Sequence, residues 1–229
     1  MRESEEQARD PREEPPIQRD PVDALASERF GVQALFPYQR LVVSNILEAA
    51  GGELRDGHER QLVILPTGAG KSLCFQLPAE LLPGITVVVY PLRSLVADQA
   101  RRLQERGIPV TVILGGQGRR EREQQWSRLE QEDAGKSRIL LSNPECLLSP
   151  VVLERLRCRS VSHMVIDEAH CVVEWGETFR PSYTRLPEVM DALEPAVVTA
   201  FTATASEYVL NRMREALFPG PATHLIARN

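Results

Sequence analysis

The segment that follows residues 61–65 combines glycine, lysine and serine in a pattern that suits phosphate binding. It consists of Thr67, Gly68, Ala69, Gly70, Lys71 and Ser72. The two glycines let backbone N–H groups turn toward an anion, a helix start adds positive potential, and Lys71 can reach the outer phosphates. Ser72 offers a hydroxyl to Mg²⁺. Although Leu65 stands where the general pattern has glycine, the segment predicts a nucleotide site; the alternative is a plain strand-to-helix turn.

Two acids follow a second apolar run, about a hundred residues later. Asp167 and Glu168 come directly after residues 161–166, and His170 is close behind them. In open α/β sheets ligands bind at the carboxyl ends of strands, where these acids are expected to lie. Asp167 is predicted to hold Mg²⁺ through water, and Glu168 to polarise the water that attacks the γ-phosphate. The alternative is a strand end with two solvated acids, but the phosphate loop favours catalysis.

An aromatic segment and two threonines suggest contact with nucleic acid. Trp175 and Phe179 offer faces on which bases can stack, at about 1–3 kcal/mol per base. Arg180 can pair with a phosphate or with groups around the two acids. Thr202 and Thr204, together with the histidine that follows the acids, can connect the nucleotide site to a DNA groove through hydrogen bonds. The alternative is that the aromatic residues pack on the edge of the sheet.

Short apolar runs alternate with helical stretches along the chain, as in an α/β fold. The runs at 61–65, 85–90, 110–114, 138–142, 161–166 and 196–201 suit parallel strands that are covered on both faces. Helices are expected from Pro37 to Gly51 and over 94–106, 119–132 and 206–217. The alternation predicts a three-layer, doubly wound, mostly parallel sheet, with the phosphate loop and the two acids on neighbouring strand ends.

The composition suits one globular domain with a short tail. Of the 229 residues, 42% are hydrophobic and 26% charged, with a formal net charge of −5. Residues 1–23 are acidic and proline-rich and predict a disordered tail, whereas residues 24–229 predict a single domain. No apolar run approaches 18 residues and no signal sequence is present, so we expect no membrane partner and a cytoplasmic (nucleoid) or nuclear location. Four cysteines without CxxC spacing predict core thiols and no zinc.

Several motifs resemble the RecQ family of DNA helicases in order and spacing, over roughly residues 28–217. They are Phe30-Gly31-x-Gln33-x-x-x-Pro37-x-Gln39, the phosphate loop, Pro91-Leu92-x-Ser94-Leu95-x-x-Asp98-Gln99, Asp167-Glu168-Ala169-His170-Cys171, Trp175-Gly176-x-x-Phe179-Arg180-Pro181-x-Tyr183 and Thr202-Ala203-Thr204-Ala205. The resemblance implies a RecA-like P-loop NTPase domain, the ATP-binding domain of a helicase. It also implies ATP contacts by Gln39 and the phosphate loop, and contact or coupling to DNA through Ser94, the aromatic segment and the two threonines.

The same resemblance implies an activity for a larger protein. With a second RecA-like lobe, in cis or in trans, the domain would couple hydrolysis of ATP with Mg²⁺ to 3′–5′ movement on single-stranded DNA and to duplex unwinding. Because the second lobe supplies arginines to the γ-phosphate, the chain alone is expected to hydrolyse ATP slowly. Two alternatives remain: a nucleotide- and DNA-binding module without independent catalysis, and a translocase lobe of a nuclease or defence complex.

The chain departs from the family beside the expected adenine site. Val32 and Phe36 stand where RecQ proteins usually have a tyrosine and an arginine. Gln39 is retained, and Phe30, Phe36 or Tyr38 are candidates for stacking on the base. The chain thus keeps one of the three side chains that the family uses around adenine.

Overall fold

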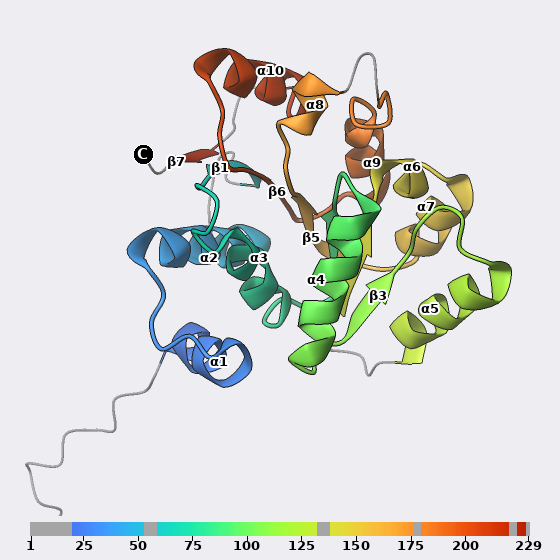
Figure 1. The fold of residues 1–229 in the computed structure, drawn as a ribbon, viewed down its shortest axis with the longest axis horizontal. Helices are drawn as coiled ribbons and strands as arrows, with labels where there is room; N and C mark the ends of the chain where they lie inside the picture. The colour runs from blue at the N-terminus through green and yellow to red at the C-terminus, as the bar shows by residue number, and fades with distance from the viewer. Residues whose placement is uncertain (1–19, 53–58, 132–137, 176–179, 220–223, 228–229) are drawn as a thin grey trace, which may run out of the picture.

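A sheet of parallel strands forms the centre of the computed structural model, which describes residues 20–52, 59–131, 138–175, 180–219 and 224–227 (Figure 1). Its strands are β1 (Arg60–Ile64), β2 (Ile85–Val89), β3 (Val110–Val112), β4 (Arg138–Ser142), β5 (Val161–Ile166), β6 (Val197–Thr202) and β7 (His224–Ala227). The order is β3-β4-β2-β5-β6-β1-β7, and each neighbouring pair is parallel. This confirms the predicted parallel sheet and adds β7, which the sequence did not predict. The phosphate loop and the two acids were expected on neighbouring strand ends, but β6 lies between β1 and β5, so that expectation was wrong.

The central strands are apolar throughout because helices cover both faces of the sheet. All five residues of β2 and all six of β5 are buried. Successive side chains point to opposite faces, so Val87 and Met164 join one core cluster, whereas Val88 and Val165 join the other. Full burial of each such side chain contributes about 1.5–3 kcal/mol.

Four helices lie on one side of the sheet. They are α1 (Pro21–Phe30), α2 (Pro37–Ala50), α3 (Lys71–Ala79) and α4 (Arg93–Glu105). Phe75 of α3 packs on Phe201 of β6 with ring centroids 5.4 Å apart, and Val42 and Val96 belong to the same cluster. The helices predicted to begin near residues 37 and 94 are therefore confirmed.

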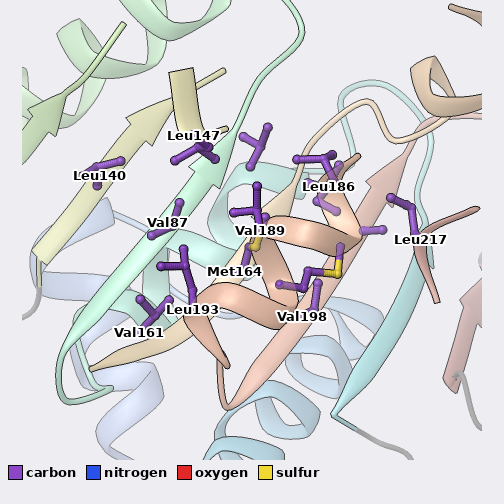
Figure 2. Close-up of a cluster of buried hydrophobic side chains, with 14 of the residues drawn as sticks. Val87, Leu140, Leu147, Val161, Met164, Leu186, Val189, Leu193, Val198 and Leu217 are labelled. Carbon is purple, nitrogen blue, oxygen red and sulfur yellow. The ribbon is translucent and has the colours of Figure 1, made fainter. Parts of the chain in front are cut away.

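The opposite face carries the remaining helices of the described residues. They are α5 (Arg119–Gln131), α6 (Pro144–Leu147), α7 (Pro150–Arg157), α8 (Cys171–Glu174), α9 (Leu186–Leu193) and α10 (Glu207–Leu217). Figure 2 shows how Leu186, Val189 and Leu193 of α9 pack toward Met164 and Val198 of the sheet. The helices predicted near 119–132 and 206–217 are confirmed, whereas α6 to α9 were not predicted because each is only four to eight residues long. Among the described helices, none has the length and apolar character needed to cross a membrane.

Helix α1 begins before the domain boundary that composition predicts. Its first residue is Pro21, and the Asp20 side chain accepts a hydrogen bond from the backbone N–H of Val22 at 2.8 Å. Arg40 of α2 pairs with Asp20 at 2.6 Å and also with Asp23. The folded part therefore starts a few residues before position 24, because these acids serve as a helix cap and as ion-pair partners. Residues 1–19 of the predicted tail lie outside the described residues.

Gly84, at the start of β2, offers a test of the packing between β2 and β5. Its φ is +82°, and an added Cβ would lie 2.5 Å from the carbonyl oxygen of Ser160. Gly107, with a φ of +67°, has open space around the same position. We expect Gly107→Ala to lower the free energy of unfolding by about 1 kcal/mol through strain alone, and Gly84→Ala by about 3 kcal/mol through strain and collision. Urea unfolding measures both values, and equal losses would contradict the predicted collision.

Candidate active site

The phosphate loop joins the end of β1 to the start of α3. Gly68 and Gly70 have φ values of +82° and +76°, a region that L side chains rarely adopt, and Gly70 caps the N-terminus of α3. The backbone N–H of Leu65 donates to Thr202 O at 3.0 Å, so the pairing of β1 with β6 continues into the loop. Lys71, the first residue of α3, has its Nζ 3.5 Å from Leu65 O. The helix N-terminus and the ammonium thus face the same turn, which suits an anion.

The first turn of α2 packs against the phosphate loop and supports it. Gln39 Nε2 donates to Ala69 O at 3.0 Å, and the Tyr38 hydroxyl donates to the same oxygen at 3.2 Å. Gln39 Oε1 accepts a hydrogen bond from the backbone N–H of Phe36 at 3.0 Å. A Cβ at Gly70 would lie 2.5 Å from Gln39 Nε2, so the second glycine is needed for this close approach as well as for its backbone angle. Gln39 is only 4% exposed, and its amide acts here as a support for the loop.

The two acids follow β5, and backbone hydrogen bonds fix this turn to the neighbouring strands β2 and β6. Asp167 N–H donates to Val89 O of β2 at 3.0 Å, and Ala169 N–H donates to Phe201 O of β6 at 2.8 Å. Glu168, between them, has a φ of +51°. For a residue other than glycine this left-handed conformation costs about 1–3 kcal/mol, a strain that is concentrated at functional sites. The turn therefore places two successive carboxylates at the carboxyl end of the sheet, as the sequence predicted.

Burial and a neighbouring charge shape the ionisation of Asp167. Its side chain is 8% exposed. Desolvation and the adjacent Glu168 carboxylate raise the pKa of Asp167 to about 6, whereas a 3.0 Å hydrogen bond from Glu168 N–H and the Lys71 ammonium act in the opposite direction. A nearby cation would therefore stabilise the ionised form of this carboxylate.

A chain of polar contacts runs from Glu168 to the end of β6. Thr202 Oγ1 donates to Thr204 O at 2.9 Å and lies 3.0 Å from His170 Nδ1. Because the Thr202 hydroxyl donates its one hydrogen to Thr204 O, its contact with His170 is a hydrogen bond when Nδ1 of the ring carries the hydrogen. The same Nδ1 lies 3.5 Å from Glu168 Oε2. The structure thus brings Glu168, His170 and Thr202 together, with Thr204 contributing its backbone carbonyl.

One pocket of about 420 Å³ gathers most of the predicted nucleotide residues. Thr67, Gly68, Gly70, Lys71, Ser72, Asp167 and Glu168 line it. The pocket also continues between α3 and α4 toward the end of α1, where Phe30, Val32, Arg102 and Arg106 line it. The two arginines were not singled out as nucleotide residues by sequence reasoning, although Gln99, Arg102 and Arg106 are spaced three to four residues apart along α4 and its C-cap.

The aromatic segment is placed only in part, because Phe179 lies outside the described residues. Trp175 is partly buried against the core, and the Arg180 guanidinium lies 6.0 Å from the centre of its ring. Arg180 donates to Pro91 O and lies 3.6 Å from a Glu145 carboxylate oxygen, so its closest partners are not the two acids. Pro91 precedes α4, whose exposed second residue is Ser94. Arg180 therefore connects the aromatic segment to the start of α4.

Comparison with known proteins gives consistent matches. Residues 36–212 match the DEAD/DEAH box helicase family. The chain is 42% identical over 149 residues to the probable ATP-dependent DNA helicase RecS of Bacillus subtilis (strain 168), covering 65% of this chain and 29% of RecS. It is 37% identical over 189 residues to the ATP-dependent DNA helicase RecQ of Haemophilus influenzae, covering 82% of this chain and 29% of that protein. The chain thus spans less than a third of the length of these relatives.

Solved structures agree on the fold. A hypothetical ATP-dependent RNA helicase from Sulfolobus tokodaii has a TM-score of 0.63 at 20% identity, over 89% of this chain and 56% of that one. The DEAD-box helicase Mss116, bound to ssRNA and UDP-BeF, has a TM-score of 0.63 at 17% identity, over 91% of this chain and 43% of that one. These similarities confirm the RecA-like fold. Because the family match runs from the start of α2 into α10, through the strands β1, β5 and β6 that carry the site, the chain belongs to the DEAD/DEAH box helicase family.

Proposed function

We propose that this chain is the ATP-binding lobe of a RecQ-like DNA helicase. In this role it couples ATP hydrolysis to 3′–5′ movement on single-stranded DNA and to duplex unwinding, together with a second RecA-like lobe. The observation that carries the proposal is the single pocket in which the phosphate loop faces Asp167 and Glu168. The RecQ-like relatives support DNA as the nucleic acid.

Ser72 and Asp167 would hold Mg²⁺ in this site. Both line the pocket, and the buried Asp167 carboxylate is only partly compensated by Lys71. Within the described part of the chain, no three His, Cys, Asp or Glu residues gather as metal ligands. Mg²⁺ commonly uses one or two carboxylates and completes its shell with water and phosphate oxygens, so this donor set fits. When bound, the ion supplies positive charge that offsets the charge of the phosphates.

The protein groups divide the chemistry between them. The loop N–H groups and Lys71 bind and orient the phosphates, and Glu168 accepts a proton from the attacking water as general base. His170 and Thr202 connect Glu168 to the end of β6 and can report on DNA bound beside it. Trp175 and Arg180 belong to the DNA side of this connection, with Phe179 and Ser94. The second lobe would bring the arginines that complete the transition-state contacts.

The first prediction separates binding from hydrolysis. We expect Lys71→Ala to weaken binding of MgADP to the chain at least tenfold, because it removes the charge that faces the phosphates. Glu168→Gln is expected to retain MgADP binding, and to abolish turnover in a two-lobed protein that contains this chain, because only the general base is lost. Calorimetric titration and a steady-state ATPase assay measure these effects. Equal nucleotide binding by Lys71→Ala and wild type would contradict the assignment of the phosphate loop.

The raised pKa of Asp167 gives a prediction for stability. The unfolded chain loses this proton near pH 4 and the folded chain near pH 6, so the free energy of unfolding falls as pH rises between these values. Above pH 6 the cost is constant at about 3 kcal/mol. In Mg²⁺-free buffer at pH 8, Asp167→Asn should therefore unfold at higher urea concentration than wild type, with the difference vanishing below pH 4.

Asp98→Asn is the matched control for this experiment. Asp98 is a half-exposed acid on α4, and the hydrogen bond from Arg101 lowers its pKa. Its replacement should not stabilise the chain at pH 8. If Asp167→Asn is no more stable than wild type at that pH, burial does not raise the pKa of Asp167 in the folded chain.

Thr202 tests the connection between hydrolysis and DNA. Thr202→Val removes the hydroxyl between His170 and Thr204 O, whereas Thr202→Ser keeps it. Coupling free energies of 1–3 kcal/mol correspond to about five- to 150-fold effects. In a two-lobed protein we expect Thr202→Val to reduce the ratio of DNA-stimulated to basal ATPase rates at least fivefold, and Thr202→Ser to preserve most of it. An unchanged ratio in Thr202→Val would assign the hydroxyl a purely local role.

A further inference from the structure

One buried thiol lies against the histidine that follows the two acids. Cys171 is the first residue of α8, is 2% exposed and belongs to the same core cluster as Met164. Its backbone N–H donates to Glu168 O at 2.9 Å, and its carbonyl oxygen accepts from Trp175 N–H at 2.9 Å. The residue therefore joins the turn that carries the acids to the aromatic segment, and the chemistry proposed above makes no use of its side chain.

The Nδ1 atom of His170 faces oxygens that need a hydrogen from the ring. Thr202 Oγ1 lies 3.0 Å from Nδ1, and the Thr202 hydroxyl donates its own hydrogen to Thr204 O at 2.9 Å. A Glu168 carboxylate oxygen lies 3.5 Å from the same Nδ1. An ionised carboxylate only accepts hydrogen bonds. Both contacts are therefore favourable when Nδ1 carries a hydrogen.

The Nε2 atom of the same ring has two competing neighbours. Cys171 Sγ lies 3.8 Å from Nε2, and a Glu174 carboxylate oxygen lies 3.9 Å from it. A thiol donates to a ring nitrogen that has no hydrogen, whereas a carboxylate accepts from a ring nitrogen that has one. The Glu174 side chain is 55% exposed, so water competes for its carboxylate. The buried thiol is shielded from this competition.

Burial keeps the hydrogen on the Cys171 sulfur. Desolvation raises the pKa of this thiol to about 12; the Glu168 and Glu174 carboxylates act in the same direction, and Arg180 opposes them. The thiol is therefore protonated at neutral pH and remains a hydrogen-bond donor. Since a neutral imidazole has one N–H, a donor beside Nε2 leaves the ring hydrogen on Nδ1. The thiol and the oxygens around Nδ1 thus favour the same tautomer.

We propose that Cys171 is a positioning residue, whose thiol donates to His170 Nε2 and holds the hydrogen of the neutral ring on Nδ1. The thiol thereby maintains the contacts of the ring with Glu168 and Thr202. In the other tautomer the ring would present a lone pair, and no hydrogen, to both of these oxygens. The effect of Cys171 on turnover rests on the proposed function, the coupling of ATP hydrolysis to DNA.

The tautomer can be measured in the chain without nucleotide or DNA. At pH 8 we expect the nitrogen NMR spectrum to show neutral His170 with its hydrogen on Nδ1 and with an unprotonated Nε2. The spectrum of His170→Gln identifies these signals among those of the 4 histidines. A neutral ring with its hydrogen mainly on Nε2 overturns the proposal and leaves the nucleotide site intact.

Two replacements separate the donor from the bulk of the side chain. Cys171→Ala removes the donor beside Nε2, whereas Cys171→Ser supplies a hydroxyl that can donate in its place. Because one hydrogen bond is lost, we expect the ratio of the Nδ1–H to the Nε2–H tautomer to fall at least about twofold in Cys171→Ala. Cys171→Ser should retain most of the ratio. Equal ratios in wild type and Cys171→Ala overturn the proposal.

The thiol itself provides a second measurement that needs no alanine variant. A donating S–H group has a lower stretching frequency than a free one, and the loss of a band in Cys171→Ser identifies the Cys171 band in the Raman spectrum. We expect the lowered frequency in the wild-type chain. The frequency of a free thiol overturns the proposal, even if Cys171→Ala does not fold.

The ratio of DNA-stimulated to basal ATPase rates tests the functional consequence in a two-lobed protein that contains this chain. We expect Cys171→Ala to reduce this ratio at least about twofold and Cys171→Ser to preserve most of it. Cys146→Ala is the matched control, since it removes another buried thiol of the same core cluster, and it should leave the ratio unchanged. Equal reductions in Cys171→Ala and Cys171→Ser would assign the side chain to packing and overturn the positioning role. If DNA does not stimulate the wild-type protein, the proposed function fails, and the tautomer measured in the chain still decides the role of Cys171.

Discussion

Backbone hydrogen bonds that continue the sheet beyond its strands hold the whole site together. Leu65 N–H reaches Thr202 O, Ala169 N–H reaches Phe201 O, and Asp167 N–H reaches Val89 O. These three bonds connect the phosphate loop to β6, and the acids to β6 and β2. Each bond lies just beyond the end of a buried strand. The closely packed core therefore holds the backbone of the phosphate loop and of the acids in fixed positions. The site therefore depends on the sheet more than on contacts among its own side chains.

The same arrangement carries two costs that a simple turn would avoid. Glu168 adopts a left-handed backbone angle, and Asp167 keeps a carboxylate in a buried position with a pKa near 6. Such costs persist only where the surrounding structure over-determines the conformation. A bound cation and the phosphates of a nucleotide would relieve the second cost, which links the stability of the domain to its proposed ligand.

The aromatic segment and the first turn of α2 show how neighbouring packing determines the role of a side chain. The sequence alone allows Arg180 to contact the two acids. In the structure its guanidinium donates to Pro91 O beside the start of α4. The sequence alone allows Gln39 to contact a base. In the structure its Oε1 accepts from Phe36 N–H at the start of α2, and its Nε2 donates to Ala69 O. In both cases a backbone carbonyl at a strand end or a loop competes successfully for the donor.

The sequence by itself determined six of the seven described strands, most of the longer helices, the phosphate loop and the acids, because each leaves a local pattern. Strands buried on both faces require apolar runs, and a phosphate loop requires glycine, lysine and serine at fixed spacing. Only the tertiary structure decided the order of the strands, in which β6, with Thr202 at its end, lies between the strands that lead to the phosphate loop and to the acids. It also decided that Arg102 lines the nucleotide pocket and that Gln39 supports the loop. These roles arise from contacts between segments distant in sequence, which leave no periodic signal within either segment.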